Sequence, residues 1–295
     1  TGVVGGQSAG VCSGSLTDYS GRVTIDDAWV AANGSVLENF DIDGSLYISA
    51  DGVTVRCGRV RGSSPYTIDN KARGTVFEWI EAFQSSNGKV ILGGNYDIYR
   101  CDVSGGEDGL HVNTGAVTVT ECYIHDQHFI DDAHADAIQA TSGGRVASVD
   151  VVRSKLINFY EAPNAAFQIN VADAWSIRES YLWGGAYSIL GDPGATGQVH
   201  DNYFGWDSSR SVRSVGSTRT SRAMCGGSGF LPAAVAGTRA PRARLPRTIP
   251  ATAPRSDGVR PDVAPALQTG GPSVAGIGVQ PVDFAEVRAL RSCYD

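Results

Sequence analysis

One short strand pattern, repeated along the chain, constrains the fold more than any other feature of the sequence. Residues 53–60 provide an eight-position template whose register recurs at intervals of 22, 21, 21, 32, 26 and 22 residues. The third and eighth positions are apolar in every copy. A single strand of this length cannot bury its own apolar face, but stacked copies can. The repeat therefore predicts an all-β, right-handed parallel β-helix, a solenoid with coils of about 21–32 residues.

The fifth template position alternates in charge from one copy to the next. In four successive copies it is occupied by Arg100, Glu121, Arg153 and Glu179. This alternation predicts ion pairs between neighbouring coils on a solvated face.

The six cysteines include no CxxC pair, so a zinc knuckle is not expected. Cys101 and Cys122 share the sixth template position in neighbouring copies. Neighbouring parallel strands lie about 4.8 Å apart, slightly too far for a relaxed disulfide, which favours two stacked thiols. A crosslink between Cys12 and Cys57, which would pin the N-terminal segment, is the alternative.

The repeat divides the chain into three segments. Residues 35–206 are predicted to form the coils, and residues 1–34 to cap the open end, where the core and a strand edge would otherwise be exposed. Residues 207–295 show neither a strand nor a helix period, and they hold twelve of the 21 arginines and nine of the 12 prolines. We expect this Pro/Arg/Gly/Ala-rich tail to be irregular or disordered, and out-of-frame translation of a GC-rich gene is an equal interpretation.

Composition and charge narrow the range of partners. The net charge of −7 argues against nucleic acid, since phosphate binding needs a basic face. No run of about eighteen apolar residues is present, so no membrane partner is expected. The sequence as given opens without a signal segment, which fits either a cytosolic protein or a processed chain. We expect a secreted monomer.

Titratable side chains gather in and just before the longest interval of the repeat. The extra residues there must leave the coil as a loop on one flank, and such loops often carry binding sites. The group contains His111, His125, His128, His134, Asp108, Asp126, Asp131, Asp132 and Asp136.

Alignment of residues 108–112, 136–140 and 165–169 stacks polar side chains in two columns. One column holds His111, Gln139 and Gln168, and the other holds Asp108 and Asp136. The predicted catalytic residues are His134, Asp136, Asp108 and His111. The predicted substrate-binding residues are Gln139, Gln168, His125 and His128, with Tyr123 and Tyr181 from an outward tyrosine column that can stack on sugar rings. Each assignment has an alternative. The Asp-Gly pair can simply form a turn, and the glutamine column can be an amide ladder that stabilises the stack. The loop histidines His125, His128 and His134 can form a transition-metal site.

The chain resembles the bacterial pectate-lyase-like family of right-handed parallel β-helix proteins. The resemblance rests on residues 117–126 and 134–139, with further matches at 167–170 and 184–188, and it covers about residues 1–206. It implies a carbohydrate-active protein whose partner is an acidic polysaccharide. The Arg/Lys arrangement of the well-known pectate lyases cannot be matched here residue by residue, which puts pectate itself in doubt as the substrate.

The resemblance implies β-elimination on a uronate-containing polysaccharide. That reaction needs a base for the proton beside the uronate carboxylate, and a group that neutralises the carboxylate. On this reading His134 is the base, and Ca²⁺ is held by Asp126, Asp131 and Asp132. A glycoside hydrolase with Asp108 and Asp136 as acid and base is the second enzymatic hypothesis. A non-catalytic glycan-binding β-helix is the third.

Overall fold

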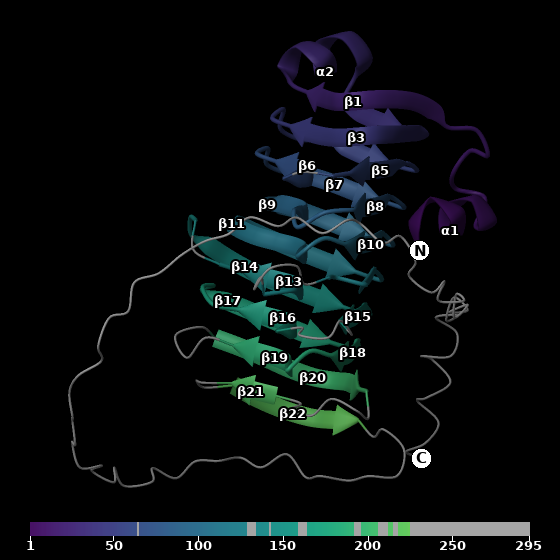
Figure 1. The fold of residues 1–295 in the computed structure, drawn as a ribbon. Helices are drawn as coiled ribbons and strands as arrows, with labels where there is room; N and C mark the ends of the chain where they lie inside the picture. The colour runs from purple at the N-terminus through teal and green to yellow at the C-terminus, as the bar shows by residue number, and fades with distance from the viewer. Residues whose placement is uncertain are drawn as a thin grey trace, which may run out of the picture. The chain divides into compact units, whose positions relative to one another are not determined.

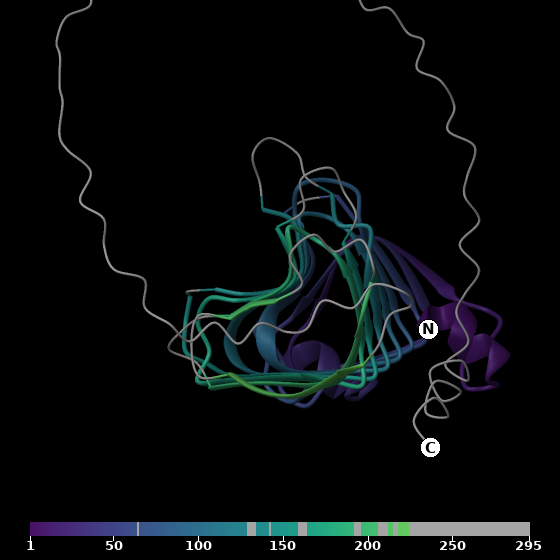
Figure 2. The same ribbon diagram turned by 90° about the horizontal axis from the view of Figure 1, so that it is seen from below.

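The chain forms a parallel β-solenoid of about eight turns (Figure 1). The computed structural model describes residues 1–63, 65–128, 134–141, 143–158, 164–191, 196–205, 212–214 and 218–224. Every strand pair among these residues is parallel. Seen along the solenoid axis, the coils lie over one another around a shared interior (Figure 2). The predicted all-β parallel β-helix is confirmed.

Each coil contributes strands to three columns. The first column contains β2 (Val36–Glu38), β4 (Thr54–Arg56), β7 (Thr75–Glu78), β14 (Val146–Val152), β17 (Ala174–Arg178) and β22 (Thr218–Met224). The second contains β5 (Arg59–Gly62), β8 (Glu81–Gln84), β10 (Asp102–Gly105), β12 (Tyr123–His125), β15 (Lys155–Asn158) and β18 (Tyr181–Gly184). The third contains β6 (Tyr66–Asn70), β13 (Asp136–Ala140), β16 (Ala165–Ile169), β19 (Tyr187–Gly191) and β21 (Val212–Ser214).

Six of the described strands pass through two columns, among them β22, which ends opposite Tyr203 in the second. β1 (Thr17–Ile25) and β3 (Phe40–Ile48) run through the second and third columns. β9 (Lys89–Tyr99) and β11 (Asp108–Thr120) run through the third and then the first. β20 (Thr196–Phe204) runs through the first and ends beside β18 in the second.

The predicted register is the observed register. The third template position pairs directly from coil to coil, for example Val119 with Val151 and Val151 with Ile177. The eighth position does the same, as in Ile124 with Leu156. The residues at these two positions are buried, apart from the half-buried Phe204 in the last copy. Burial of matching apolar side chains in successive coils supplies the driving force for stacking.

Each coil turns from the first to the second column through one residue in the left-handed region. This is the fifth template position, and its φ angles lie between 46° and 58° at Cys57, Trp79, Arg100, Glu121, Arg153, Glu179 and Asp201. Such angles are uncommon for residues other than glycine and cost about 1–2 kcal/mol each. The predicted ion pairs form along part of this corner column: Glu121 lies 2.7 Å from Arg100 and 3.1 Å from Arg153. Glu179 instead lies 3.8 Å from its sequence neighbour Arg178.

Glycine at position 179 is expected to stabilise the solenoid. Glu179 has φ 52°, and among the described residues its side chain makes only the long contact with Arg178, so Glu179→Gly removes backbone strain and little else. Removal of the backbone strain should stabilise the folded state by about 1–2 kcal/mol. Glycine also has more conformational entropy in the unfolded chain, which reduces the net gain in the free energy of unfolding to about 0.5–1 kcal/mol. Chemical denaturation measures this gain. Gln198→Gly, in the extended part of β20, is the control and should destabilise; equal losses in both variants would contradict the strain argument.

The N-terminal residues cover the solenoid in two different places. α2 (Asp27–Asn33) lies beyond β1 at the open end, and its Trp29 and Val30 pack against the core (Figure 1). α1 (Gly2–Ser8) lies instead against the flank beside β8 and β10, where the Gly2 amide donates to the Arg100 carbonyl at 2.8 Å. The end-capping function predicted for residues 1–34 thus falls to α2. Neither helix is long or apolar enough to cross a bilayer, and no other described segment offers such a helix.

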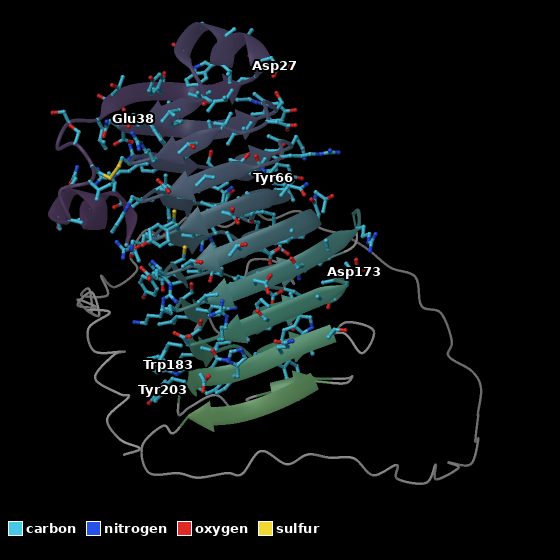
Figure 3. The ribbon with its side chains drawn as sticks, turned by 180° about the vertical axis from the view of Figure 1, so that it is seen from behind. Asp27, Glu38, Tyr66, Asp173, Trp183 and Tyr203 are labelled. Carbon is cyan, nitrogen blue, oxygen red and sulfur yellow. A yellow bond between two sulfur atoms is a disulfide. The ribbon has the colours of Figure 1, made fainter. Side chains whose placement is uncertain are left out.

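A disulfide fixes the N-terminal segment to the flank. Cys12 and Cys57 are bonded, closing a separation of 45 residues (Figure 3). Cys101 and Cys122 are buried free thiols in neighbouring coils. The stacked thiols and the alternative crosslink are therefore both present.

The coils continue beyond residue 206, where the pattern was expected to stop. β22 pairs with β20 in parallel, Gly197 opposite Thr218 and Val199 opposite Thr220. β21 likewise pairs with β19. Thr220 takes the third template position, opposite Val199, so apolar periodicity does not reveal this coil. The remainder of the predicted tail, residues 207–211, 215–217 and 225–295, lies outside the described residues.

Candidate functional site

The polar cluster lies on the outer face of the third column, where its strands begin. In register, Lys89, Asp108 and Asp136 occupy one row across β9, β11 and β13. Three residues later, His111 pairs with Gln139, and Gln139 with Gln168, as the sequence alignment predicted.

A local irregularity places Asp108 and His111 on the same face. Residues three apart in a regular strand point to opposite faces. Here both intervening residues face the core: a Cβ on Gly109 would lie 2.5 Å from Ile124 Cγ2, and Leu110 is fully buried. Both flanking polar residues therefore face outward. Since Gly109 has no room for a side chain, its identity helps to bring the carboxylate and the imidazole together.

Asp108 is a buried carboxylate held by two partners. Its Oδ2 accepts from Lys89 Nζ at 3.0 Å and from His111 Nδ1 at 2.7 Å. Lys89 also contacts the Glu107 carboxylate. Burial lowers the pKa of Lys89, but Asp108 and Glu107 outweigh that effect and raise it overall, so the ammonium stays charged. The ammonium group of Lys89 therefore balances the negative charge of Asp108 within the buried site.

This carboxylate sets the orientation and tautomer of His111. With its Nδ1 donating to Asp108, the neutral imidazole carries its lone pair on Nε2. Nε2 faces the hydroxyl of Thr141 at 2.9 Å. The Thr141 hydroxyl, the His111 imidazole and the Asp108 carboxylate thus form one hydrogen-bonded chain. Such a chain orients a histidine to accept a proton.

Asp136 lies in a different environment from Asp108, although the two occupy adjacent strands. Burial, and then the proximity of Asp108, raise the pKa of Asp136 well above its usual range. Hydrogen bonds from Gln139 Nε2 at 2.8 Å and from the Ala165 amide at 2.7 Å oppose the shift without cancelling it. Asn164 Nδ2 donates to Asp136 Oδ1 at 3.2 Å. A carboxyl group paired with Lys89 and a carboxyl group whose pKa is raised by burial therefore lie in neighbouring coils of the site.

The amide of Gln168 also lies against Asp136. With this amide reversed, its Nε2 donates to Asp136 Oδ2 at 2.8 Å and its Oε1 accepts from Asn170 Nδ2 at 2.9 Å. The hydrogen-bond partners favour the reversed orientation, because it satisfies both ends of the amide.

Solvent reaches only the outer members of the cluster. Asp108 and Asp136 are 0% exposed, whereas the side chain of His111 is 16% exposed. Gln139 and Gln168 keep 8% and 6%. A substrate at this surface therefore meets an imidazole and two amides, and the carboxyl groups act through them.

The predicted loop residues are placed differently. His134 is exposed, and within the described part of the chain no hydrogen bond or ion pair holds it. His128 is half-buried, and its amide donates to the Gly106 carbonyl at 2.8 Å. The predicted metal ligands Asp131 and Asp132 lie outside the described residues. The structure thus brings together Asp108, Asp136, His111, Gln139 and Gln168 but not His134.

His125 is engaged by two carboxylates and a ring. Its Nε2 lies 2.9 Å from Asp102 Oδ1, its Nδ1 lies 2.8 Å from Asp126 Oδ2, and the imidazole stacks on Tyr123 at 3.8 Å. With both ring nitrogens occupied, His125 has no nitrogen free to bind a metal. Among the described residues no group of three or more histidine, cysteine, aspartate or glutamate side chains lies close enough to hold a metal ion.

Stability is expected to fall at alkaline pH because of His125. Burial alone lowers the pKa of this imidazole, but its hydrogen bonds to Asp102 and Asp126 outweigh burial and raise it to about 9. The stabilisation is fully present below the unfolded value of about 6.5 and is lost as pH rises through about 9. Unfolding titrations across this range should show a slope of up to one proton, which His125→Gln removes. His200→Gln, at a half-buried histidine on β20, should leave the slope in place; a slope that persists in His125→Gln would refute the assignment.

A cavity of about 480 Å³ adjoins the site along the same row. Tyr66, one coil before Lys89 in register, lines it together with Lys89, Ser86 and Asn87. Lys89 therefore belongs both to the cavity wall and to the Asp108 ion pair. A polymer lying along the third column would pass from this cavity to His111.

Three site residues were missed in the sequence: Lys89, Thr141 and Asn164. The row of Asp108 and Asp136, extended one coil back, reaches Lys89, so the alignment contained that signal. Thr141 directly follows the aligned segment 136–140. Asn164 lies just outside the repeat, where no periodicity points to it.

The parallel β-helix implied by the resemblance is confirmed, and the pectate-lyase-like assignment stays a prediction. No protein-family model, no curated protein and no solved structure matches this chain.

Proposed function

We propose that this protein is a polysaccharide lyase that cleaves a uronate-containing glycan by β-elimination, with His111 as the base. The observation that carries the proposal is the Asp108–His111 pair at 2.7 Å, in which the carboxylate is buried and the imidazole is the part that solvent reaches. His134 becomes the alternative base, because nothing in the described structure orients its ring.

In this reaction His111 Nε2 removes the proton from the carbon next to the uronate carboxylate. The electron pair of that C–H bond forms a carbon–carbon double bond, and the glycosidic C–O bond on the neighbouring carbon breaks. The leaving oxygen then takes up a proton, from the imidazolium or from water. Asp108 stabilises the imidazolium, and Lys89 forms the ion pair that balances the charge of Asp108. The Thr141 hydroxyl occupies Nε2 until the substrate replaces it.

Hydrogen-bond donors must bind the carboxylate of the uronate. Gln139 and Gln168 present amide groups beside His111 on the outer face. Burial raises the pKa of Asp136 beneath them, which favours its neutral form and so lessens repulsion of a bound carboxylate.

Burial weakens the hydrolase alternative. A general acid and a general base must touch the glycosidic oxygen and the attacking water, but Asp108 and Asp136 are 0% exposed. Their strands are neighbours, about 4.8 Å apart, which argues against inversion (about 6.5–9.5 Å between carboxyl groups) but not against a retaining enzyme (about 5–5.5 Å), so burial carries this argument. An exposed imidazole oriented by a buried carboxylate fits elimination better.

The setting that we propose for the protein is extracytoplasmic. The Cys12–Cys57 disulfide supports this location, because such bonds persist in oxidising compartments. We propose an acidic polysaccharide as the partner and a monomer as the acting form. Ca²⁺ stays a hypothesis for Asp126, Asp131 and Asp132, and no step above depends on it.

The test is an ultraviolet assay for the unsaturated uronate that only elimination produces. Polygalacturonate, alginate, glucuronan and hyaluronan are each incubated with the full chain, with calcium and with a chelator. We expect absorbance to rise on one polymer. New reducing ends without absorbance would show a hydrolase, and binding without either signal would show a non-catalytic glycan-binding protein; both outcomes reject the proposal. A rise that the chelator abolishes would assign a role to calcium.

A further inference from the structure

The cavity beside Lys89 lies between two successive coils of the solenoid. Its walls are the segments that follow β5 and β8, together with the first residues of β6 and β9. The Ser86 hydroxyl donates to the Ser63 carbonyl across these walls. The Lys89 amide donates to the Pro65 carbonyl at 2.9 Å. The volume of about 480 Å³ is within the range of small-molecule sites, so the cavity can hold a sugar ring.

Tyr66 supplies an aromatic face to this cavity (Figure 3). The two tyrosines that the sequence indicated for sugar binding have covered rings, because His125 stacks on Tyr123 at 3.8 Å and Tyr203 stacks on Tyr181 at 5.0 Å. The Tyr66 side chain is half-buried, and among the described residues no other aromatic ring and no cation contacts it. Its ring is therefore available to the apolar face of a sugar.

The cavity and the His111 site lie on one line along the third column. Tyr66 pairs in register with Lys89, and Lys89 pairs with Asp108. Two strand spacings, about 10 Å, therefore separate the strand of Tyr66 from the strand that carries His111. An oligosaccharide that runs along the column can occupy both places at once.

The cavity offers no positive charge for a carboxylate. Lys89 is the only cation among the described residues that line it, and its ammonium contacts the carboxyl groups of Glu107 and Asp108. Two carboxyl groups thus face one ammonium group. A third carboxyl group, brought in by a ligand, would find like charge and no free partner. The local charge therefore favours an uncharged sugar.

The hydroxyl group of Ser86 favours the same ligand. Its two polar neighbours are the Ser63 carbonyl and Gln84 Oε1, the second at 3.2 Å, and both are acceptors. The hydroxyl hydrogen is thus used within the protein, and the oxygen is left to accept a hydrogen bond. A sugar hydroxyl can donate that bond, whereas a carboxylate can only accept.

We propose that this cavity is a subsite for an uncharged sugar of the same glycan whose uronate lies at His111. The sugar ring stacks on Tyr66, and a hydroxyl group of the sugar donates to Ser86 Oγ. The inference rests on the proposed function, because it assumes a uronate at His111, and it narrows the substrate class. A chain made only of uronates would place a carboxylate in the cavity, so the substrate is a glycan that contains both uronates and uncharged sugars.

The experiment measures binding by calorimetry in full-length His111→Ala, so that turnover does not interfere. Oligosaccharides of hyaluronan and chondroitin, which contain uncharged sugars, are compared with those of polygalacturonate and alginate, which do not. We expect the mixed chains to bind more tightly. Tyr66→Ala should weaken binding of long mixed chains about three- to tenfold and leave disaccharides unaffected, because a disaccharide at His111 does not reach the cavity.

Two further variants test the role of the ring. Tyr66→Phe keeps the aromatic face and should bind as the parent does. Tyr19→Ala removes a tyrosine that is 39% exposed on β1, away from the cavity, and should also bind as the parent does. Thermal unfolding of every variant shows that the fold is kept.

The outcomes separate this inference from the proposed function. Tighter binding of the uronate-only chains, equal losses for disaccharides and long chains, unchanged affinity in Tyr66→Ala, or no binding by the parent would each overturn the subsite. The ultraviolet assay tests elimination independently. A flat trace from a protein that shows the Tyr66-dependent binding would reject elimination and support the subsite. Rising absorbance on polygalacturonate, with the same rate in Tyr66→Ala, would support elimination and overturn the subsite.

Discussion

Replacement of His111 by alanine is expected to lower the elimination rate by about 10²–10⁴-fold, the usual contribution of a positioned general base. The expectation rests on the Nδ1–Asp108 bond at 2.7 Å, which leaves Nε2 as the proton acceptor. Steady-state kinetics in the ultraviolet assay provide the measurement. Because the glycan is held by other groups, the loss should appear in kcat rather than in KM.

His134→Ala is the matched control, since His134 is an exposed histidine in the loop that follows His125. We expect near-wild-type rates in this variant. Loss of activity in His134→Ala, with activity retained in His111→Ala, would return the base to the residue that the sequence favoured. His111→Gln, which preserves much of the shape and one hydrogen bond to Asp108, should be as inactive as alanine while unfolding at the wild-type temperature.

Lys89→Met is expected to cost about 3 kcal/mol of stability and most of the activity. Asp108 is 0% exposed, and Lys89 Nζ at 3.0 Å balances its charge. Removal of one partner of a buried ion pair leaves the other buried and uncompensated, at a cost of about 3–5 kcal/mol. The loss should shrink at low pH, where the stranded carboxyl group becomes neutral. Denaturant titrations at several pH values check both effects.

Lys71→Met serves as the control for Lys89→Met. The Lys71 side chain is 47% exposed and lies 2.8 Å from Asp69, so its loss should cost no more than about 1 kcal/mol. Equal stability changes in the two variants would show that the Lys89 pair is screened by solvent. In that case Asp108 could not serve as the buried orienting group for His111.

The coil register could be predicted from sequence because burial enforces it. A one-residue slip would turn Val119 and Val151 to the solvent, so the apolar positions report the pairing directly. The same logic placed His111 opposite Gln139 and Asp108 opposite Asp136. Alternating charge likewise predicted the contacts of Glu121 with its neighbours.

Protonation and access could not be predicted from the same pattern. Asp108 and Asp136 are equivalent in the alignment, but Lys89 stabilises the charge of one and burial raises the pKa of the other. His134 attracted attention because acidic residues are close to it in sequence, which says nothing about contact in a loop. The last coil escaped notice because Thr220 takes the third template position, which is apolar in every earlier copy.

The left-handed corner residues determine where the chain can accept inserted residues. A corner made by one residue tolerates no extra length, because an added residue would shift every side chain that follows to the opposite face. The wide intervals of 32 and 26 residues accordingly take up their extra length elsewhere, between β12 and β13 and between β15 and β16. Both connections open beside Asp136 and Asn164. Grafted peptides and evolutionary variation should therefore be accepted at this edge of the solenoid, where new sequence would change the surface beside the candidate site without disturbing the stack.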